Sequence, residues 1–319
     1  MEMRQDAWKI YSDLAVEDRE RFPGKETEVP GVALEKETLP GEITRTRVEI
    51  RNEVGAAQMG KPEGIYITLE RKDIVAAEEK IQEQFVDVLA DSIRELLPDG
   101  WNTLLVAGLG NRYLTVDALG PETVDALQMT RHIRKERQLC GVIPGVLAQT
   151  GMESAELVQG LAEKVQPDAV LVVDALAARN MERLGTTVQL ANVGIQPGSG
   201  VHNHRWALNE ETLGCPVLSL GVPTVIGAAA LASDTVQALS EVLVRMEEME
   251  QEGEIGHFFG HLGEQERLEL IRQLLPPETV QMQVTPVLVD QMVENFGKIL
   301  AEGIQRAVEK NGIGGKRGE

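Results

Sequence analysis

Short apolar runs alternate with amphipathic stretches from about residue 100 to residue 240. The runs predict strands at residues 104–107, 142–144, 170–173 and 217–220, and the amphipathic stretches predict helices at 121–132, 154–165 and 224–249. Strands that alternate with helices at this spacing are typical of a parallel sheet covered by helices. Residues 170–173 are apolar at every position, which indicates a strand buried on both faces. The sequence therefore predicts an α/β fold with a mostly parallel sheet.

The flanking parts of the chain follow other patterns. Strands are predicted at residues 46–50 and 65–69, and a helix at 76–97, where apolar residues recur with a period near 3.6. Helices are also predicted at 263–275 and from Thr285-Pro286 to about 308, since threonine is a good N-cap and proline suits the first helical position. The glycine-rich end, residues 311–319, is expected to be a flexible tail.

Composition and charge narrow the class of protein. Aromatic residues make up 3% of the 319 residues, so the core must be aliphatic. No apolar run approaches the roughly 18 residues of a membrane span, and the N-terminus lacks a secretory signal, so we expect a cytosolic protein. The net charge of −20 disfavours nucleic acid and anionic lipid as partners, although it also serves solubility alone. Cys140 and Cys215 are predicted to be reduced and half-buried, with no catalytic role.

Two aspartates are the best candidates for chemistry. Asp117 and Asp174 each follow an apolar segment and each precede Ala-Leu. Acids in this position lie at the carboxyl edge of a parallel sheet, where α/β folds build their sites. Two such carboxylates could share a proton and activate water. The alternative is that each caps a following helix, and spacing alone does not decide between the two.

Glycine-rich turns give weaker signals. Gly108-Leu109-Gly110-Asn111 lacks the third glycine of a dinucleotide fingerprint, so it indicates a structural turn and no cofactor. Gly198, Ser199 and Gly200 could cradle an anion through their backbone N–H groups, or form a flexible turn. The serine in this segment does not fit the Gly-x-Ser-x-Gly elbow of a nucleophile.

Histidines do not build a convincing metal site. His257 and His261 have the spacing of two ligands on one helix, but Phe258 replaces the glutamate of a zinc protease motif. His202 and His204 could coordinate a metal or contact substrate, and a solvated loop is the favoured interpretation. No metal is therefore predicted.

Three long segments carry a resemblance to a known family. They are GVIPGVLAQTGMESAELVQG (141–160), PDAVLVVDALAARNMERLGTTVQLANVGIQPGSGV (167–201) and ETLGCPVLSLGVPTVI (211–226). These segments closely resemble the germination protease of endospore-forming bacteria. SDLAVE near the start, TVDALGP and ASDT resemble it too. The match is dense over residues 12–240 and loose over the helical C-terminus.

The resemblance implies an activity and an architecture. The activity is that of an atypical aspartic-type endopeptidase that initiates degradation of small acid-soluble spore proteins in the cytoplasm of the forespore or spore core. The architecture is a three-layer α/β fold similar to hydrogenase-maturation proteases, with a helical C-terminal part. The family assembles as a homotetramer, and no direct nucleic-acid or membrane partner is expected. Its catalytic aspartates fall in the DALGP and DALAAR segments, which here contain Asp117 and Asp174.

The family is also made as a self-processing zymogen. Its propeptide ends in Thr-Asp before Leu-Ala, and this chain has Ser12-Asp13 before Leu14-Ala15, so cleavage is predicted between Asp13 and Leu14. The expected organisation is a propeptide (1–13), a single α/β peptidase domain (14–310) and the flexible tail (311–319).

Substrate contacts are less well defined. The possible substrate-binding residues are Arg179, Arg183, Arg131, Gly198, Ser199 and Gly200, since the target bond follows an acid. An ordinary surface role is the alternative for each arginine. The chain reads GVHNHRWALNE where the family usually reads GVGNKRKE, so no role of that loop is implied.

Two rival functions stay open at this point. One is a metal-dependent peptidase on the same fold, with His202 or His204 as a ligand. The other is a non-catalytic acidic protein that sequesters basic or DNA-associated proteins. A strong chelator would inhibit the first, and an Asp117→Asn substitution would leave the second functional.

Overall fold

The computed structural model describes residues 11–22, 29–195, 207–250 and 282–309, together with residues 266, 273, 275, 276, 278 and 279. The predicted tail at 311–319 and most of the predicted helix at 263–275 lie outside these residues.

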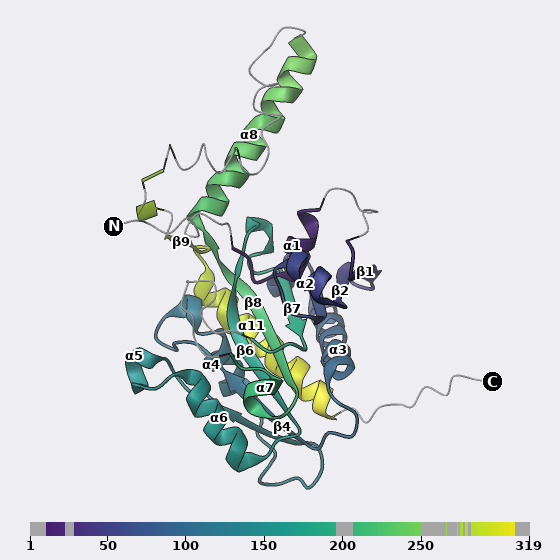
Figure 1. Cartoon of the computed structure of the whole chain (residues 1–319), viewed down its shortest axis with the longest axis vertical. Coiled ribbons are helices and arrows are strands. Elements are labelled where there is room, and N and C mark those ends of the chain that lie inside the picture. Colours follow the sequence, from purple (N-terminus) through teal and green to yellow (C-terminus); the bar gives the residue numbers. More distant parts are fainter. Residues whose placement is uncertain are drawn as a thin grey trace, which may run out of the picture.

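Within the described residues, nine strands form one mixed sheet (Figure 1). The strands are β1 (Val32–Leu39), β2 (Ile43–Ile50), β3 (Gly64–Glu70), β4 (Thr103–Gly108), β5 (Gln138–Val142), β6 (Ala169–Ala178), β7 (Thr187–Ala191), β8 (Val217–Gly227) and β9 (Gln283–Val284). Their order is β1-β2-β3-β7-β8-β6-β4-β5, and β9 pairs with β8. The ladders among β5, β4, β6 and β8 are parallel, and the remaining ladders are antiparallel.

Helices cover both faces of this sheet. They are α1 (Ala15–Glu20), α2 (Glu53–Met59), α3 (Glu79–Leu96), α4 (Leu119–Ala126), α5 (Leu147–Thr150), α6 (Ser154–Val165), α7 (Glu210–Leu213), α8 (Ala228–Glu250) and α11 (Val289–Glu309), with 3-10 turns η2 (Ile74–Ala76), η3 (Thr115–Asp117) and η4 (Met181–Arg183). The predicted α/β fold, with a helical C-terminal part, is confirmed.

Side chains of β6 point alternately to the two faces of the sheet, and each face is covered by a layer of helices. Leu171 and Val173 belong to the large core that contains residues of α3, α4 and α11. Val170 and Val172 point the other way, into a second core with α6. Successive side chains of a strand point to opposite faces, so a strand with apolar residues at every position is buried on both. Figure 1 shows α6 and α11 on opposite sides of the sheet accordingly.

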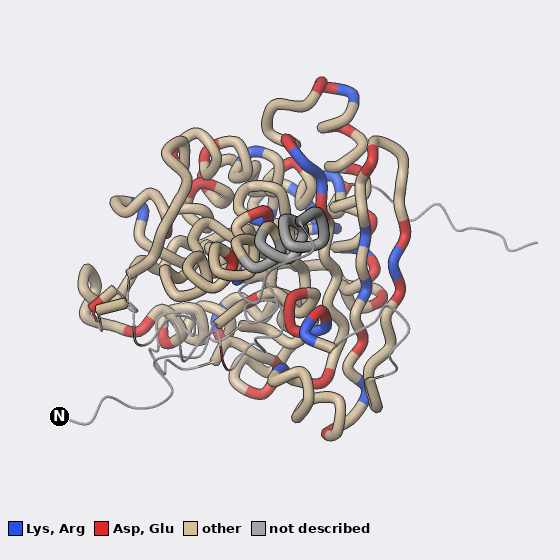
Figure 2. The backbone as a smooth tube through the Cα atoms, turned by 90° about the horizontal axis from the view of Figure 1, so that it is seen from above, with Lys and Arg blue, Asp and Glu red and all other residues tan. Residues whose placement is uncertain are grey.

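The outer hairpin of β1 and β2 carries charges of both signs, visible along the edge strands in Figure 2. Arg45 pairs with Glu37 across the hairpin at 3.0 Å, and Arg47 pairs with its neighbour Glu49 at 2.9 Å. Charged side chains on an edge strand oppose pairing with further chains. Helix α8 projects away from the sheet (Figure 1).

Several predicted boundaries differ from the structure. Strand β8 continues to Gly227, so α8 begins at Ala228 rather than at 224. Thr224 stays in the strand because its hydroxyl donates to the carbonyl oxygen of Val116 at 2.7 Å. Helix α4 ends at Ala126, earlier than predicted, and β5 lies before the predicted 142–144 strand.

Candidate active site

Asp174 is the first residue of β6 beyond its pairing with β4. The last pair between these strands joins Gly108 to Val173, and Asp174 is the next residue of β6. It shares its face of the sheet with Val172 and Leu176, because even-numbered residues of β6 point to the side of α6. The side chain is 9% exposed, and its Oδ1 accepts a hydrogen bond from the Ala175 N–H at 2.9 Å.

Asp117 ends the 3-10 turn η3, just before α4. Its Oδ2 accepts a hydrogen bond from the Asn111 N–H at 2.9 Å, so this carboxylate closes the turn that follows β4. The N-cap of α4 is Ala118, and Asp174 lies inside a strand. The structure therefore does not place either aspartate at a helix N-cap, the alternative that the sequence left open.

Close backbone packing brings the two aspartates to the same end of β4. The Leu109 N–H donates to the carbonyl oxygen of Val173 at 2.8 Å, directly beside Asp174. The next residue, Gly110, packs against Asp117, and a Cβ at that position would lie 3.1 Å from Asp117 Oδ1. The loop after β4 thus contacts one aspartate and the neighbour of the other.

The predicted processing bond lies on the same strand. The Asp13 N–H donates to the carbonyl oxygen of Ala177 at 2.9 Å, and Asp13 Oδ2 accepts the Ala177 N–H at 2.7 Å. The Leu14 side chain is fully buried and packs against Leu176 and Ala178. Asp13 and Leu14 are therefore held on β6, just beyond Asp174.

Gln189 of β7 contacts both sides of this bond. Its Nε2 donates to the carbonyl oxygen of Asp13 at 2.9 Å, and its Oε1 accepts the Ala15 N–H at 2.7 Å. Gln189 pairs with Gly221 of β8, which pairs with Asp174. Residues paired across a sheet share a face, so Gln189 and Asp174 project from the same row on the same side.

A cavity of about 340 Å³ opens beside the processing bond. Its lining includes Tyr11, Asp13, Leu176, Gln189 and Gly221. The cavity leaves room for solvent next to the carbonyl group of Asp13, which a hydrolytic reaction needs.

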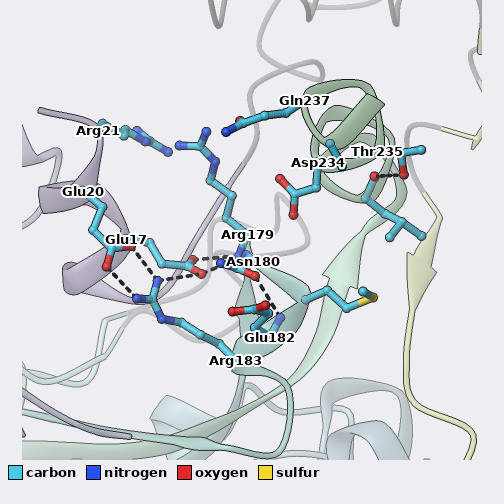
Figure 3. A pocket seen from close by; sticks show the side chains of 13 residues that line it. Glu17, Glu20, Arg21, Arg179, Asn180, Glu182, Arg183, Asp234, Thr235 and Gln237 are labelled. Carbon is cyan, nitrogen blue, oxygen red and sulfur yellow. Dashed lines mark hydrogen bonds and ion pairs between the residues drawn. The ribbon is translucent and has the colours of Figure 1, made fainter. Parts of the chain in front are cut away.

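A second cavity, of about 930 Å³, lies between α1, the end of β6 and α8 (Figure 3). Arg183 is held there by carboxylates of the chain itself, at 2.9 and 2.8 Å from Glu20 and 3.1 Å from Glu70. Burial acts to lower the pKa of Arg183, but these carboxylates outweigh it and raise the pKa, so the guanidinium stays charged. Arg179 points toward Arg21 and Gln237 in the same view.

Glu17 of α1 accepts hydrogen bonds from the residues that follow β6. Its carboxylate accepts the N–H groups of Arg179 and Asn180 at 2.7 and 2.9 Å and lies 3.3 Å from the guanidinium of Arg183. The Ser12 hydroxyl donates to the same carboxylate. The chain on both sides of the predicted cut is thus anchored through one buried acid.

The structure describes some of the other sequence candidates and not others. Seven of them fall outside the described residues, namely Gly198, Ser199, Gly200, His202, His204, His257 and His261.

Cys140 and Cys215 are free and half-buried, as predicted, and burial raises the pKa of both thiols. Where residues are described, no three His, Cys, Asp or Glu side chains gather as metal ligands. Likewise, no helix in those ranges has the length and apolar character of a membrane span.

Sequence reasoning missed Gln189 and Glu17. Gln189 sits in the short strand TVQLA, and Glu17 sits in SDLAVE. Both lie in segments that carry the family resemblance, but neither stands in a pattern that indicates chemistry, and both become informative only when the fold places them against residues 12–15.

Comparison with known proteins gives a consistent result. A family model described as germination protease matches residues 10–253. A germination protease from Clostridium perfringens is 39% identical, over 95% of this chain and 96% of that protein. One from Bacillus pumilus is 36% identical, over 95% and 94%. Among solved structures, a NiFe hydrogenase maturation protease from Thermococcus kodakarensis is 20% identical, with a TM-score of 0.29, and covers 42% of this chain and 80% of its own.

Proposed function

Because this chain belongs to the germination protease family, we propose that it is an atypical aspartic-type endopeptidase that begins the degradation of small acid-soluble spore proteins during germination. The position of the predicted processing bond is the observation that carries this proposal. The Asp13–Leu14 bond rests on β6 beside the segment that contains Asp174, with a cavity next to it.

Asp117 and Asp174 are the proposed catalytic pair. One is ionised and takes a proton from water, and the other is protonated and polarises the carbonyl group of the substrate. Two carboxylates in one site do not both ionise readily, because like charges at short range repel. Their common position at the end of β4 supports the pair.

The chain is proposed to be a zymogen that processes itself. Residues 12–14 occupy the site in the manner of a substrate, with Asp13 on Ala177 and Leu14 in an apolar pocket. Cleavage after Asp13 removes residues 1–13 and frees this part of β6 for other proteins. The backbone N–H of Ala177 is a donor that suits an acid before the cut.

Substrate contacts, assembly and location complete the proposal. Arg179 lines the larger cavity and is the candidate for acidic substrate residues, whereas Arg183 already holds Glu20 and Glu70. Gly198, Ser199 and Gly200 stay possible substrate contacts. The protein is proposed to act as a homotetramer in the cytoplasm of the forespore and spore core.

Mass spectrometry of the purified chain tests the function. Incubation should convert it into a product that begins at Leu14, and this product should cleave a small acid-soluble spore protein. Asp117→Asn and Asp174→Asn should abolish both reactions without loss of folding. Asp125→Asn is a matched control, since Asp125 is exposed and pairs with Arg112 at 3.2 Å. Retention of even a tenth of wild-type turnover in Asp174→Asn would contradict the aspartic mechanism.

A further inference from the structure

Gln189 donates a hydrogen bond to the carbonyl oxygen of the bond predicted to be cut. We infer that the side-chain amide of Gln189 is the oxyanion donor of this protease and stabilises the negative charge that forms on that oxygen during hydrolysis. This inference rests on the proposed function, because it assumes that the Asp13–Leu14 bond is a substrate of the site.

The orientation of the amide follows from its two partners. A backbone N–H can only donate, so the Gln189 atom 2.7 Å from the Ala15 N–H is the oxygen, Oε1. The nitrogen, Nε2, then faces the Asp13 carbonyl oxygen at 2.9 Å. The amide is locked by the chain that follows the cut, and it presents an N–H to the atom that becomes the oxyanion.

The surroundings make this donor effective. Gln189 lies inside β7, between Thr68 of β3 and Gly221 of β8, and it is 8% exposed. A donor fixed on a strand needs no rearrangement as charge develops, and a buried site strengthens its interaction with that charge. Donors of this kind typically contribute a factor of about 10²–10³ to kcat.

Gly221 lies between Gln189 and Asp174. The three residues form one row across the sheet, so the outer two are separated by roughly two strand spacings, about 10 Å. A Cβ on Gly221 would lie 2.6 Å from Leu176 Cγ, so the missing side chain leaves space for Leu176, which packs against Leu14. The residue after the predicted cut is thus packed beside this row, and the Asp13 carbonyl oxygen has its donor, Gln189, at one end of it.

The bond changes balance with water as the co-reactant. The water oxygen attacks the Asp13 carbonyl carbon while the ionised aspartate takes a water proton, and the carbonyl π electrons move to the oxygen that faces Gln189 Nε2. The oxyanion then re-forms the carbonyl group and the C–N bond breaks. The Leu14 nitrogen receives a proton from the aspartate pair and leaves as the amine.

Two substitutions of Gln189 test the inference. Gln189→Met keeps the length of the side chain and removes the donor, and Gln189→Glu replaces the donor with a carboxylate that repels an oxyanion. Thr68→Val is the matched control, because Thr68 is a buried neighbour in the same row and its hydroxyl has no hydrogen-bond partner among the described residues. Thermal unfolding of each variant checks that it folds.

The measurements are the first-order rate of processing, and kcat and KM of a chain that begins at Leu14 on a peptide copied from residues 8–19. We expect Gln189→Met to lower the processing rate and kcat by about 10²–10³, with KM changed by less than about threefold. We expect Gln189→Glu to be at least as slow at neutral pH and to recover rate at acidic pH relative to Gln189→Met, because a protonated carboxyl group can donate. Thr68→Val should keep the wild-type kcat.

Other outcomes separate the inference from the function. If the wild type cleaves but Gln189→Met keeps kcat within threefold, or changes KM alone, then Gln189 is not an oxyanion donor and the proposed function stands. If Gln189→Met fails to fold, the pH profile of Gln189→Glu decides, and a profile parallel to that of the wild type would overturn the inference. If the wild type does not cleave, or if Asp174→Asn cleaves equally well, the proposed function itself fails.

Discussion

Gly120 lets α4 pack closely against the backbone beside Asp174, and Gly120→Ala should move Asp117 relative to Asp174. Gly120 lies in the first turn of α4, directly after the DAL of Asp117, and it packs on the backbone beside Asp174. A Cβ at this position would lie 2.6 Å from the carbonyl oxygen of Val173 and closer still to that of Leu109. Both neighbours are backbone atoms, one in β6 and one in the residue that follows β4, so we expect α4 and η3 to move instead.

The size of the movement sets the expected effect. Ordinary contact between a Cβ and an oxygen begins near 3.4 Å, so the helix must shift by nearly 1 Å. Overpacking of this kind costs about 1–3 kcal/mol of folding free energy. A misplacement of about 1 Å in a catalytic group can cost about 10²-fold in rate. Gly120→Ala should therefore stay folded and lose about 10²-fold in kcat.

The assay combines urea unfolding with the processing rate, and Gly160→Ala provides the control. Gly160 lies on the exposed face of α6, where a Cβ has no neighbour within 4 Å, so alanine should stabilise the helix by about 0.5–1 kcal/mol and leave processing unchanged. A Gly120→Ala protein with normal processing would refute the reasoning, because it would show that the packing of α4 does not set the geometry of the pair.

Three further predictions concern the N-terminal segment, acid stability and the chemistry of the site. Glu17→Gln should lower the free energy of unfolding by about 1–3 kcal/mol and slow processing. The reason is that the N–H groups of Arg179 and Asn180 and the guanidinium group of Arg183 lose a charged partner. Urea titration measures the first effect, and mass spectrometry measures the second. Hydrogen bonds from Arg47 lower the pKa of Glu49 below 4.5. Glu49→Gln should therefore lower the free energy of unfolding by less than about 1 kcal/mol at pH 7, and this difference from wild type should vanish as pH falls below 4.5 through the folded pKa. Unfolding curves at several pH values check this. Cleavage should survive dialysis against a strong chelator and alkylation of Cys140, and loss of activity with the chelator alone would favour a metal-dependent mechanism.

The sequence predicts β4, β6 and β8 of the parallel half of the sheet and β2 and β3 of the antiparallel half, and it misses β1 and β7. Strand β6 is recognisable because both of its faces are apolar, and α6 matches the predicted 154–165 helix at both ends. Strand β1 was missed because its side chains are mostly exposed and charged, as in the run VALEKETL. Strand β7 was missed because it is short and carries Gln189 in its centre. An exposed edge strand such as β1, and a short strand with a polar residue at its centre such as β7, show little hydrophobic periodicity in the sequence.

Only part of the candidate site could be predicted from the sequence, because only part of it leaves a local pattern. Asp117 and Asp174 follow apolar runs, so local pattern was enough to select them as candidates, although Asp174 lies inside β6 and not at its end. The partnership of Gln189 with Asp13 joins residues that are 176 positions apart, and no local pattern encodes it. Predicting it requires the strand order, in which β7 and β6 flank β8.

The contacts of residues 12–17 differ on the two sides of the proposed cut. The part before it binds through the Asp13 carboxylate on the N–H of Ala177 and through the Asp13 carbonyl group on the amide of Gln189, contacts that another peptide with an acid at this position could make. The part after the cut binds through its own side chains, with Leu14 in an apolar pocket and Glu17 on the end of β6. The proposed cleavage would therefore release the half whose contacts another peptide could make and keep the half that is held by Leu14 and Glu17. A second protein with an acid before its target bond would then bind where Asp13 lay, so the proposed removal of residues 1–13 would supply the substrate site.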